Sequence, residues 1–320
     1  MHPIKIGIIG SGVAAKRIYS IIKELDKSFK IEFYSNTRKY FFLNRKKIIL
    51  KKFNFNSKDL EQELFFIANN TSLHFKYLNF LLTNNIPVYV EKPICTTDKE
   101  IKILINSLKK FKKKLSVGYQ FRENNCLKYL KKKIKLNRSK LINVMCYSGE
   151  NVKKYHKYEN YLNSYTVNKN KGGGVLLTQS HQIDVLTFLF GDLICHSGLR
   201  VDRDKNFRLN SNVETNVTYI LKSSDNIPIC CNLNYFGLTK THIQISFENE
   251  ILTWNNNNSI LIEKRNSKHN KNIFFMQTRN NMFKKKIQYF VKNMSKKNTI
   301  KENREIIKTI KLLNEIKSKI

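Results

Sequence analysis

The stretch Ile4-Lys5-Ile6-Gly7-Ile8-Ile9-Gly10-Ser11-Gly12-Val13-Ala14-Ala15 decides the fold. Its first half is a nearly continuous apolar run, which is typical of a strand buried on both faces. The second half has the pattern G-x-G-x-x-A. In this pattern the first glycine permits a tight turn, the second lets backbone approach a pyrophosphate, and the small third residue allows close helix–strand packing. An apolar stripe at helical spacing follows, so the amino end of a helix would face the phosphates. We therefore expect a dinucleotide-binding loop at Gly10–Ala14.

The second predicted strand, Ile31–Tyr34, ends in Ser35-Asn36-Thr37-Arg38. At this distance from the glycine motif, an NAD site usually offers Asp or Glu to the ribose 2′-hydroxyl. No acid is present, and a hydroxyl with an arginine suits a 2′-phosphate. The pattern favours NADP over NAD, with Ser35 and Arg38 as contacts; the alternative is that Arg38 merely begins a basic loop.

Strand-like and helical segments then alternate as far as Leu115–Val117, which predicts a parallel, doubly wound sheet. One predicted strand, Val88–Val90, runs into Glu91-Lys92-Pro93. Because proline cannot continue a ladder, Lys92 would stand at the carboxyl edge of the sheet, where ligands bind in such folds. The alternative is that Lys92 is one surface lysine among many.

The alternation stops near Phe121, so we expect domains at residues 1–121 and 122–320. In the second part, three glycines at 172–174 precede a helical segment with His181 and Asp184 three residues apart. That spacing puts both on one helical face, where the carboxylate could orient the imidazole; a structural histidine is the alternative. Several strand-like segments between Val217 and Ile262 predict a largely antiparallel sheet, so the second domain would be α+β.

Composition describes a folded globular protein with 41% hydrophobic residues and a net charge of +35. The lysines are scattered among Asn, Ile, Phe and Tyr. Compositional drift in the coding sequence explains the positive charge about as well as a nucleic-acid partner does, so we do not expect such a partner. The charge would still steer anionic substrates towards the protein. The six cysteines lack metal-ligand spacing, and we expect reduced thiols and no metal. Neither a signal peptide nor a membrane-spanning stretch is recognisable, so we expect a cytoplasmic protein.

Three motifs in order resemble the glucose–fructose oxidoreductase, inositol dehydrogenase and rhizopine catabolism (Gfo/Idh/MocA) family: Gly10–Ala15, Glu91-Lys92-Pro93 and the block Gly172–Asp184. Thr71-Ser72-Leu73-His74 and Tyr119-Gln120-Phe121-Arg122 also look like family segments. The resemblance implies a Rossmann domain, a second domain whose open sheet often mediates homo-oligomerisation, and hydride transfer between a nicotinamide and a sugar carbon. The stretch from Tyr155 to Tyr165 looks like members that act on sugars or nucleotide sugars for surface polysaccharides.

The resemblance also implies residue roles. His181 would be the principal acid/base, oriented by Asp184, with Lys92 holding the reacting oxygen. Tyr119, Arg122 and Tyr165 would contact the substrate. Many members carry an aspartate one turn before the histidine, where this chain has Leu177 and Thr178. That departure leaves a second hypothesis open, a non-catalytic dinucleotide-binding regulator. Beside the glycine loop, Ser35 and Arg38, the expected cofactor contacts are Asn70, Thr71, His74, Glu91, Lys92, Pro93 and Gln120.

Overall fold

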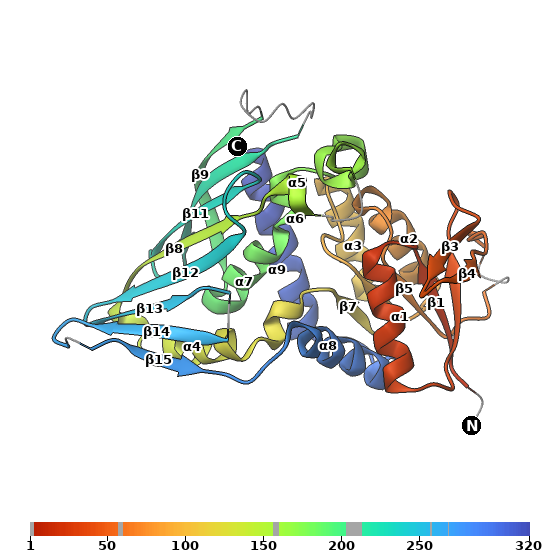
Figure 1. Ribbon diagram of the computed structural model, residues 1–320, viewed down its shortest axis with the longest axis horizontal. Helices are drawn as coiled ribbons and strands as arrows, with labels where there is room; N and C mark the ends of the chain where they lie inside the picture. Colours follow the sequence, from red (N-terminus) through yellow and green to blue (C-terminus); the bar gives the residue numbers. More distant parts are fainter. Residues whose placement is uncertain (1–2, 57–59, 156–159, 203–212, 257, 268) are drawn as a thin grey trace. The chain divides into compact units, whose positions relative to one another are not determined.

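The computed structural model describes residues 3–56, 60–155, 160–202, 213–256, 258–267 and 269–320, which fall into two compact units (Figure 1). The first unit comprises Met1–Gln120 and Asn280–Ile307, and the second comprises Phe121–Arg279 and Lys308–Ile320. The chain passes from the first unit to the second after Gln120, and residues 280–307 return to the first unit.

The first unit contains a five-stranded parallel sheet in the order β2-β1-β5-β6-β7. Beyond β2, Tyr34 forms a parallel bridge with Lys51, so a single residue stands where a further edge strand would pair. With that residue counted, the order matches the dinucleotide-binding 3-2-1-4-5-6 arrangement. The prediction of a doubly wound parallel sheet is confirmed. The elements are β1 (Lys5–Ile9), α1 (Val13–Leu25), β2 (Lys30–Tyr34), β5 (Leu64–Ile67), α2 (Thr71–Thr83), β6 (Val88–Val90), α3 (Asp98–Lys110) and β7 (Leu115–Val117).

A β-hairpin follows β2, in the place where a doubly wound fold usually has a helix. Its strands are β3 (Tyr40–Leu43) and β4 (Lys46–Ile49), and they form a separate two-stranded sheet. The turn consists of Asn44 and Arg45, both with positive φ (48° and 64°). Two left-handed residues suit the twist of a two-residue hairpin, although arginine is an unusual choice for such a position. The sequence analysis did not anticipate this hairpin.

The return of the chain to the first unit is explained by helix α8 (Arg279–Asn293). Phe283, Ile287 and Phe290 of α8 are buried in the same core as the apolar residues of β1, α1 and β5. Helix α9 (Ile300–Ser318) follows and opens with a capping box: Thr299 Oγ1 accepts from Glu302 N–H (3.1 Å), and Glu302 Oε2 accepts from Thr299 N–H (2.7 Å). The later part of α9 belongs to the second unit.

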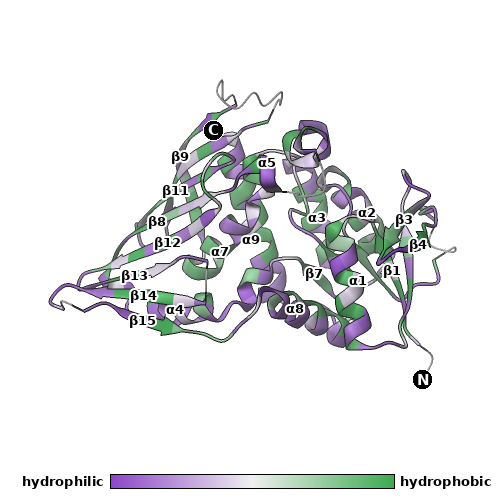
Figure 2. Ribbon diagram, in the orientation of Figure 1, coloured by the Kyte–Doolittle hydropathy of each residue, from purple (hydrophilic) through white to green (hydrophobic). Residues whose placement is uncertain are grey.

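The second unit is built on an eight-stranded sheet in the order β15-β14-β13-β12-β8-β11-β10-β9. Only the pair β8–β11 is parallel, so the prediction of a largely antiparallel sheet is confirmed. Hydrophilic and hydrophobic residues alternate along its strands (Figure 2), as expected when one face is covered by helices. The strands are β8 (Leu141–Gly149), β9 (Leu193–Val201), β10 (Asn216–Ser223), β11 (Pro228–Asn234), β12 (Lys240–Phe247), β13 (Glu250–Trp254), β14 (Ser259–Lys264) and β15 (Lys271–Phe274).

Helices α4, α6, α7 and the later part of α9 lie on one side of this sheet (Figure 1). The glycine–histidine block folds into α6 and α7, so His181 is the second residue of a helix and Asp184 lies one turn further on. Residues 156–159, which belong to the stretch from Tyr155 to Tyr165, lie outside the described residues. The helices of this unit are α4 (Asn125–Leu136), α5 (Val152–Tyr155), α6 (Val175–Thr178) and α7 (Ser180–Phe190), with the 3-10 turns η2 (Gln120–Glu123), η3 (Arg138–Lys140), η4 (Tyr161–Asn163), η5 (Tyr165–Val167) and η6 (Lys169–Lys171).

Candidate active site

The glycine loop between β1 and α1 has the backbone that the motif requires. Gly10 has a φ of +126°, and a Cβ there would lie 2.4 Å from the carbonyl oxygen of Ala68. Gly12, in contrast, is exposed, and a Cβ there would meet nothing within 4 Å. Gly10 is therefore needed for the fold, whereas the space in front of Gly12 is open. Ala15 is fully buried in the core, as expected of the small residue that brings helix and strand together.

The amino end of α1 is suited to an anion. Gly12 is the N-cap and supplies no side-chain cap, and the first turn holds no acidic residue. The first N–H groups of a helix have no intrahelical acceptor and carry partial positive charge. Ser11 and Ala14 are partly exposed beside Gly12, and Val13 is 59% exposed. The open loop can thus present backbone donors to a phosphate.

The turn after β2 brings the predicted specificity residues together. Ser35 Oγ accepts from the N–H groups of Thr37 (3.2 Å) and Arg38 (3.1 Å), so the serine organises the turn. Its own N–H donates to the carbonyl oxygen of Lys51 (2.9 Å). The Arg38 side chain is exposed. Contact of Ser35 and Arg38 with a 2′-phosphate stays a prediction.

The loops after β5 and β6 are joined by His74. Its ring nitrogens lie 2.9 Å from the carbonyl oxygen of Pro93 and 3.0 Å from that of Asn69, and the residue is 2% exposed. Burial lowers the pKa of His74, and the two carbonyl contacts oppose that shift. Asn70, the exposed N-cap of α2, and buried Thr71 stand beside it. His74 thus holds the cofactor-side loops together; direct contact with a cofactor stays a prediction.

The Glu91-Lys92-Pro93 motif leaves the end of β6, with a cis peptide between Lys92 and Pro93. The Glu91 carboxyl lies over Gly118, where a Cβ would come 2.7 Å from Oε2. Burial raises the pKa of Glu91, and the cations of Arg17 and Lys92 oppose the rise. Lys92 is partly exposed at the carboxyl edge of the sheet, where it was expected. Tyr119 and Gln120 follow β7 and are buried.

In the second unit, the glycines at 172–174 are approached by the chain itself. A Cβ on Gly173 would lie 2.4 Å from the carbonyl oxygen of Tyr165, and one on Gly174 (φ +111°) would lie 2.3 Å from Glu214 Oε1. Glu214 Oε1 accepts from the N–H of Leu176 (3.2 Å), in the first turn of α6. Groups of the protein itself therefore occupy the space next to these glycines. Tyr165, the expected substrate contact, is partly exposed next to them.

His181 stands out by its exposure. Among the residues from Gly172 to Thr187, His181 is partly exposed and all the others are buried. Its ring stacks on Phe121 with centroids 5.2 Å apart and planes at 30°. Phe121 in turn meets Trp254 edge-on at 6.1 Å. A buried aromatic pair therefore supports an imidazole that reaches the surface of the second unit.

Asp184 forms a buried ion pair with Arg122. Asp184 Oδ1 accepts from Arg122 Nη2 (2.6 Å) and Nε (3.0 Å), and from Thr309 Oγ1 of α9 (3.0 Å). The Asp184 side chain is 1% exposed and that of Arg122 is 15% exposed. The pair fixes α7 to the segment that carries Phe121. Orientation of His181 by Asp184 and contact of Arg122 with substrate both stay predictions.

The position of the missing family aspartate is filled by a neutral network. Thr178 Oγ1 lies 2.8 Å from Tyr235 Oη and 2.9 Å from the carbonyl oxygen of Gly174, and Tyr235 Oη donates to the carbonyl oxygen of Thr166 (3.0 Å). Leu177 is 8% exposed. Hydroxyls in buried hydrogen bonds support the helix, but they supply no negative charge beside the histidine.

Other reactive groups do not converge on this region. Within the described residues no cluster of His, Cys, Asp and Glu could hold a metal ion. All six cysteines are free thiols, and burial raises the pKa of Cys126 to about 11, which keeps that thiol protonated at neutral pH. In the part of the chain that the structure describes, no helix is long and apolar enough to cross a membrane.

Sequence reasoning missed Phe121, Glu214, Tyr235, Trp254 and Thr309. Each contributes through a contact between positions far apart in the chain. Only Phe121 carried a signal, because it lies inside the segment Tyr119–Arg122 that resembles the family. The other four had no pattern in the sequence that could have linked them to α6 or α7.

The fold and the glycine loop define an NAD(P)-binding oxidoreductase architecture, and comparison with known proteins specifies the family. Residues 4–119 match the model described as Oxidoreductase family, NAD-binding Rossmann fold (Gfo/Idh/MocA). The match confirms the resemblance found in the motifs of this segment. The search of curated proteins gives no match.

Solved structures share the fold over the whole chain. A single-residue variant of KijD10, a 3-ketoreductase from Actinomadura kijaniata in complex with TDP-benzene and NADP, is 14% identical with a TM-score of 0.81; the match covers 99% of this chain and 98% of that one. An oxidoreductase from Thermotoga maritima is 14% identical with a TM-score of 0.78, covering 99% and 96%. At this identity the likeness establishes the fold of both units.

Proposed function

We propose that the protein is an NAD(P)-dependent oxidoreductase that acts on a CH–OH group of a sugar or nucleotide sugar. One pathway that would use this activity is surface polysaccharide synthesis. The observation that carries the proposal is the exposure of His181 at the start of α7, alone among sixteen successive residues at 172–187 that are otherwise buried. Packing alone does not account for a buried segment in which only an imidazole is accessible. An acid/base group requires this accessibility.

The cofactor half of the proposal rests on the first unit. The open space at Gly12 and the uncapped, acid-free first turn of α1 fit a pyrophosphate. Gly10, Ser11, Val13 and Ala14 would complete that cradle. The nicotinamide, when bound, supplies the hydride acceptor or donor, and the carboxyl edge with Lys92 would hold its reactive end. The remaining proposed contacts are Asn70, Thr71, His74, Glu91, Pro93 and Gln120.

We favour NADP over NAD. The turn after β2 offers Ser35 and the exposed Arg38 and has no acid at the position that would bind a ribose 2′-hydroxyl. The KijD10 structures contain NADP, which is consistent with this preference. The net charge of +35 would favour either dinucleotide and does not discriminate between them.

The chain's own residues would move the proton. When an alcohol is oxidised, His181 takes the hydroxyl proton while Lys92 donates a hydrogen bond to the same oxygen; reduction reverses both steps. Asp184 and Arg122 would act by holding α7 and Phe121 in register, and Phe121 would set the plane of the imidazole. Tyr119 and Tyr165 remain the proposed substrate contacts, and any further hydrogen bond from Arg122 to substrate would come in addition to its pair with Asp184.

A non-catalytic dinucleotide-binding regulator is the second candidate. The neutral Thr178–Tyr235 network at the site of the family aspartate favours it, because a hydroxyl at that position supplies no negative charge to make a histidine more basic. The two candidates differ in turnover and agree in cofactor binding.

We also propose that the protein is a homo-oligomer that associates through the open face of its second sheet. One row of paired residues crosses all eight strands of that face without a charged side chain, which is unusual in a protein with 26% charged residues. Met145 (48% exposed) and Ile220 (39%) lie in it. The row is Asn272, Leu261, Thr253, Gln244, Met145, Cys230, Ile220 and Ser197.

Six free thiols are consistent with a cytoplasmic site of action.

Sedimentation velocity tests the oligomer. Met145→Glu should convert the wild-type oligomer to monomer, because it would place a charge in the middle of an uncharged interface. Leu136→Glu, at a 70% exposed position on α4, is the control and should leave the oligomer intact. A wild-type protein that sediments as a monomer at every concentration contradicts this part of the proposal.

Titration with reduced cofactor tests the cofactor site. Wild-type protein should enhance NADPH fluorescence and bind NADPH at least about tenfold more tightly than NADH, since an arginine–phosphate pair contributes more than about 1.4 kcal/mol. Arg38→Ala should remove the preference while NADH affinity stays the same. Lys47→Ala, on the nearby hairpin, controls for general loss of charge. Failure of the wild type to bind either dinucleotide excludes both candidate functions.

A further inference from the structure

The β3–β4 hairpin (residues 39–52, including its flanking residues) has no role in the proposed catalysis. Its inner face is anchored on the core of the first unit: Phe41 and Leu43 are buried there, and Phe41 meets Phe33 edge-on with centroids 4.9 Å apart. The hairpin lies at the edge of the first unit (Figure 1). It is therefore a rigidly mounted element with a second, outward face.

That outward face is apolar. Tyr40 is 49% exposed, Phe42 56% and Ile49 67%. The strand register pairs Tyr40 with Ile49 and Phe42 with Lys47, so the four side chains lie together on one side of the ribbon. The rings of Tyr40 and Phe42 are 5.8 Å apart. The side chains on the outer, solvent-facing side of such an element are ordinarily polar. Three large apolar side chains in one exposed patch of the hairpin therefore indicate a partner.

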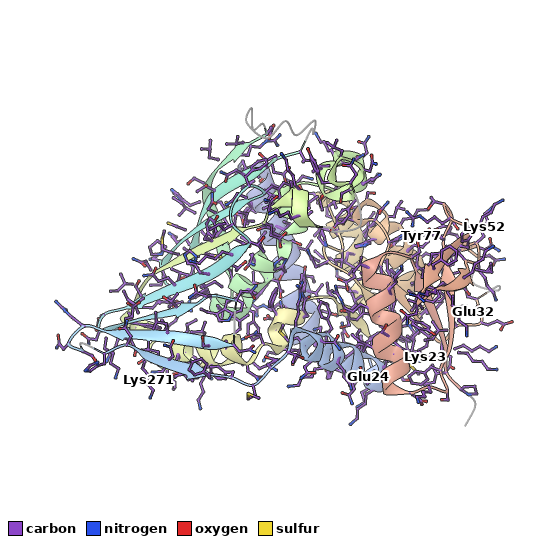
Figure 3. The ribbon with its side chains drawn as sticks, in the orientation of Figure 1. Lys23, Glu24, Glu32, Lys52, Tyr77 and Lys271 are labelled. Atoms are coloured by element: carbon purple, nitrogen blue, oxygen red, sulfur yellow. The ribbon has the colours of Figure 1, made fainter. Side chains whose placement is uncertain are left out.

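The same segment is strongly basic. It contains six cations and no acid: Lys39, Arg45, Lys46, Lys47, Lys51 and Lys52. Lys51 pairs with Glu32, whereas the other five have no ion-pair partner within the described residues. Lys52 and Glu32, labelled in Figure 3, lie on the side of the first unit that carries the hairpin. On α4, in contrast, Lys128 pairs with Glu123 and Lys133 with Glu250, so part of that basic surface is neutralised.

An apolar face flanked by cations without ion-pair partners is complementary to an anionic lipid surface. Aromatic and aliphatic groups gain free energy at the boundary between headgroups and acyl chains, and each lysine or arginine near the surface adds electrostatic attraction. A single-stranded polynucleotide would also use cations and rings, but it gives no role to Ile49, the most exposed of the three, because stacking needs a ring. The composition of the patch therefore favours lipid.

We propose that the β3–β4 hairpin docks the protein on an anionic membrane surface. Tyr40, Phe42 and Ile49 enter the interfacial layer, and the unpaired cations around them contact lipid phosphates. The association is peripheral and reversible. It depends on the hairpin alone and holds whether or not the protein turns over a sugar.

Co-sedimentation with vesicles of phosphatidylglycerol and phosphatidylcholine, compared with phosphatidylcholine alone, tests the docking. Wild-type protein should bind the anionic vesicles and not the neutral ones, with affinity that falls as salt is added. Tyr40→Ser with Phe42→Ser should weaken binding about tenfold without changing net charge. Lys46→Glu with Lys47→Glu should weaken it at least about tenfold.

The matched control is Lys132→Glu with Lys135→Glu, which makes the same charge change at exposed positions of α4. It should weaken binding less than about threefold, since those residues belong to the other unit and are not part of the hairpin. Equal losses in the hairpin and control variants would overturn the proposal, because binding would then reflect diffuse charge. Far-ultraviolet circular dichroism confirms that each variant is folded.

A Phe42→Trp variant reports on insertion directly. Its emission should shift to the blue on anionic vesicles and be quenched by lipids brominated on their acyl chains, whereas Leu136→Trp on α4 should do neither; the native Trp254 is buried and gives a constant background. An unshifted, unquenched Phe42→Trp contradicts the proposal. Tighter binding to a mixed-sequence oligonucleotide than to vesicles, lost in Tyr40→Ser with Phe42→Ser, would replace the lipid with a nucleic acid.

Discussion

The candidate functional regions of the two units are built in different ways. In the first unit the region consists mainly of backbone: a glycine with φ +126°, an uncapped helix and the carboxyl ends of the parallel strands. In the second unit it consists of one imidazole held by side chains from distant parts of the chain, with Arg122, Asp184 and Thr309 as the buried core of the arrangement. A backbone site is robust to most side-chain changes, whereas a site held by buried polar groups depends on every partner.

Removing one partner of the buried ion pair should give the largest effect. Asp184→Ala leaves the Arg122 guanidinium without its carboxylate at a position only 15% exposed, which should lower the free energy of unfolding by about 3–5 kcal/mol. Urea unfolding followed by the fluorescence of Trp254 measures this loss in the second unit. The double variant Arg122→Met with Asp184→Leu should recover most of it, since apolar groups need no partners. A loss below about 1 kcal/mol in the single variant would mean that the pair does not hold α7.

The glycine loop separates fold from binding. Gly10→Ala should lower the free energy of unfolding by at least about 2 kcal/mol, because its φ is unsuited to a side chain and the new Cβ would meet the Ala68 carbonyl oxygen. Gly12→Ala should change stability by less than about 0.5 kcal/mol but weaken NADPH binding at least about tenfold, since the methyl group fills the space proposed for the pyrophosphate. The comparison fails if Gly12→Ala binds NADPH as the wild type does.

Loss of the ring beneath His181 should have a smaller effect on stability. Phe121→Leu keeps an apolar group at a 6% exposed position but removes the stack, and it should cost about 1 kcal/mol. If Phe121 positions the imidazole, turnover should fall at least about tenfold while KM stays near the wild-type value. Phe190→Leu, at a 4% exposed position of the same helix α7, is the control and should leave turnover unchanged. Equal kinetics in both variants would show that the stack is only structural.

The smallest expected effect is a pH dependence in the first unit. Burial lowers the pKa of His74 in the folded protein, so below the ordinary value of 6.5 the unfolded chain binds more protons. The stability that neutral His74 provides is therefore full above about pH 6.5 and is lost as the pH falls below it. Unfolding free energies at about pH 7.5 and 5.5 should differ less in His74→Gln than in the wild type. The raised pKa of Glu91 acts in both proteins and largely cancels in this difference. A steeper pH dependence in the variant would contradict the assignment.

The same contrast explains what could be predicted from the sequence. The strands and helices of the first unit follow from apolar runs and capping residues, which are local signals; β6 and β7 were predicted at their observed bounds. Helix α3 begins with a capping box, in which Thr97 Oγ1 accepts from Glu100 N–H (3.3 Å). The order of motifs was sufficient to recognise the family.

Long-range contacts were the part that could not be predicted. Asp184 was expected to face His181 because the two share a helical face, but that spacing could not reveal that Arg122 and Thr309 surround the carboxylate. The hairpin was missed because its turn, Asn44-Arg45, lacks the usual glycine. The return of α8 to the first unit depends on packing by Phe283, Ile287 and Phe290, whose helical spacing gave no indication of which core they would join.

The central claim is that this chain transfers hydride with His181 and Lys92 as its proton-handling groups, and consumption of reduced cofactor tests it most directly. NADPH absorbance should be followed with a panel of TDP- and UDP-linked keto sugars, for wild type, His181→Ala and Lys92→Ala, after each variant is shown to be folded and to bind NADPH. We predict that the wild type oxidises NADPH with at least one substrate and that each variant loses at least about 10²-fold in kcat. A wild type that binds NADPH but reduces no member of the panel would favour the regulator, and variants with wild-type turnover would contradict the assigned roles.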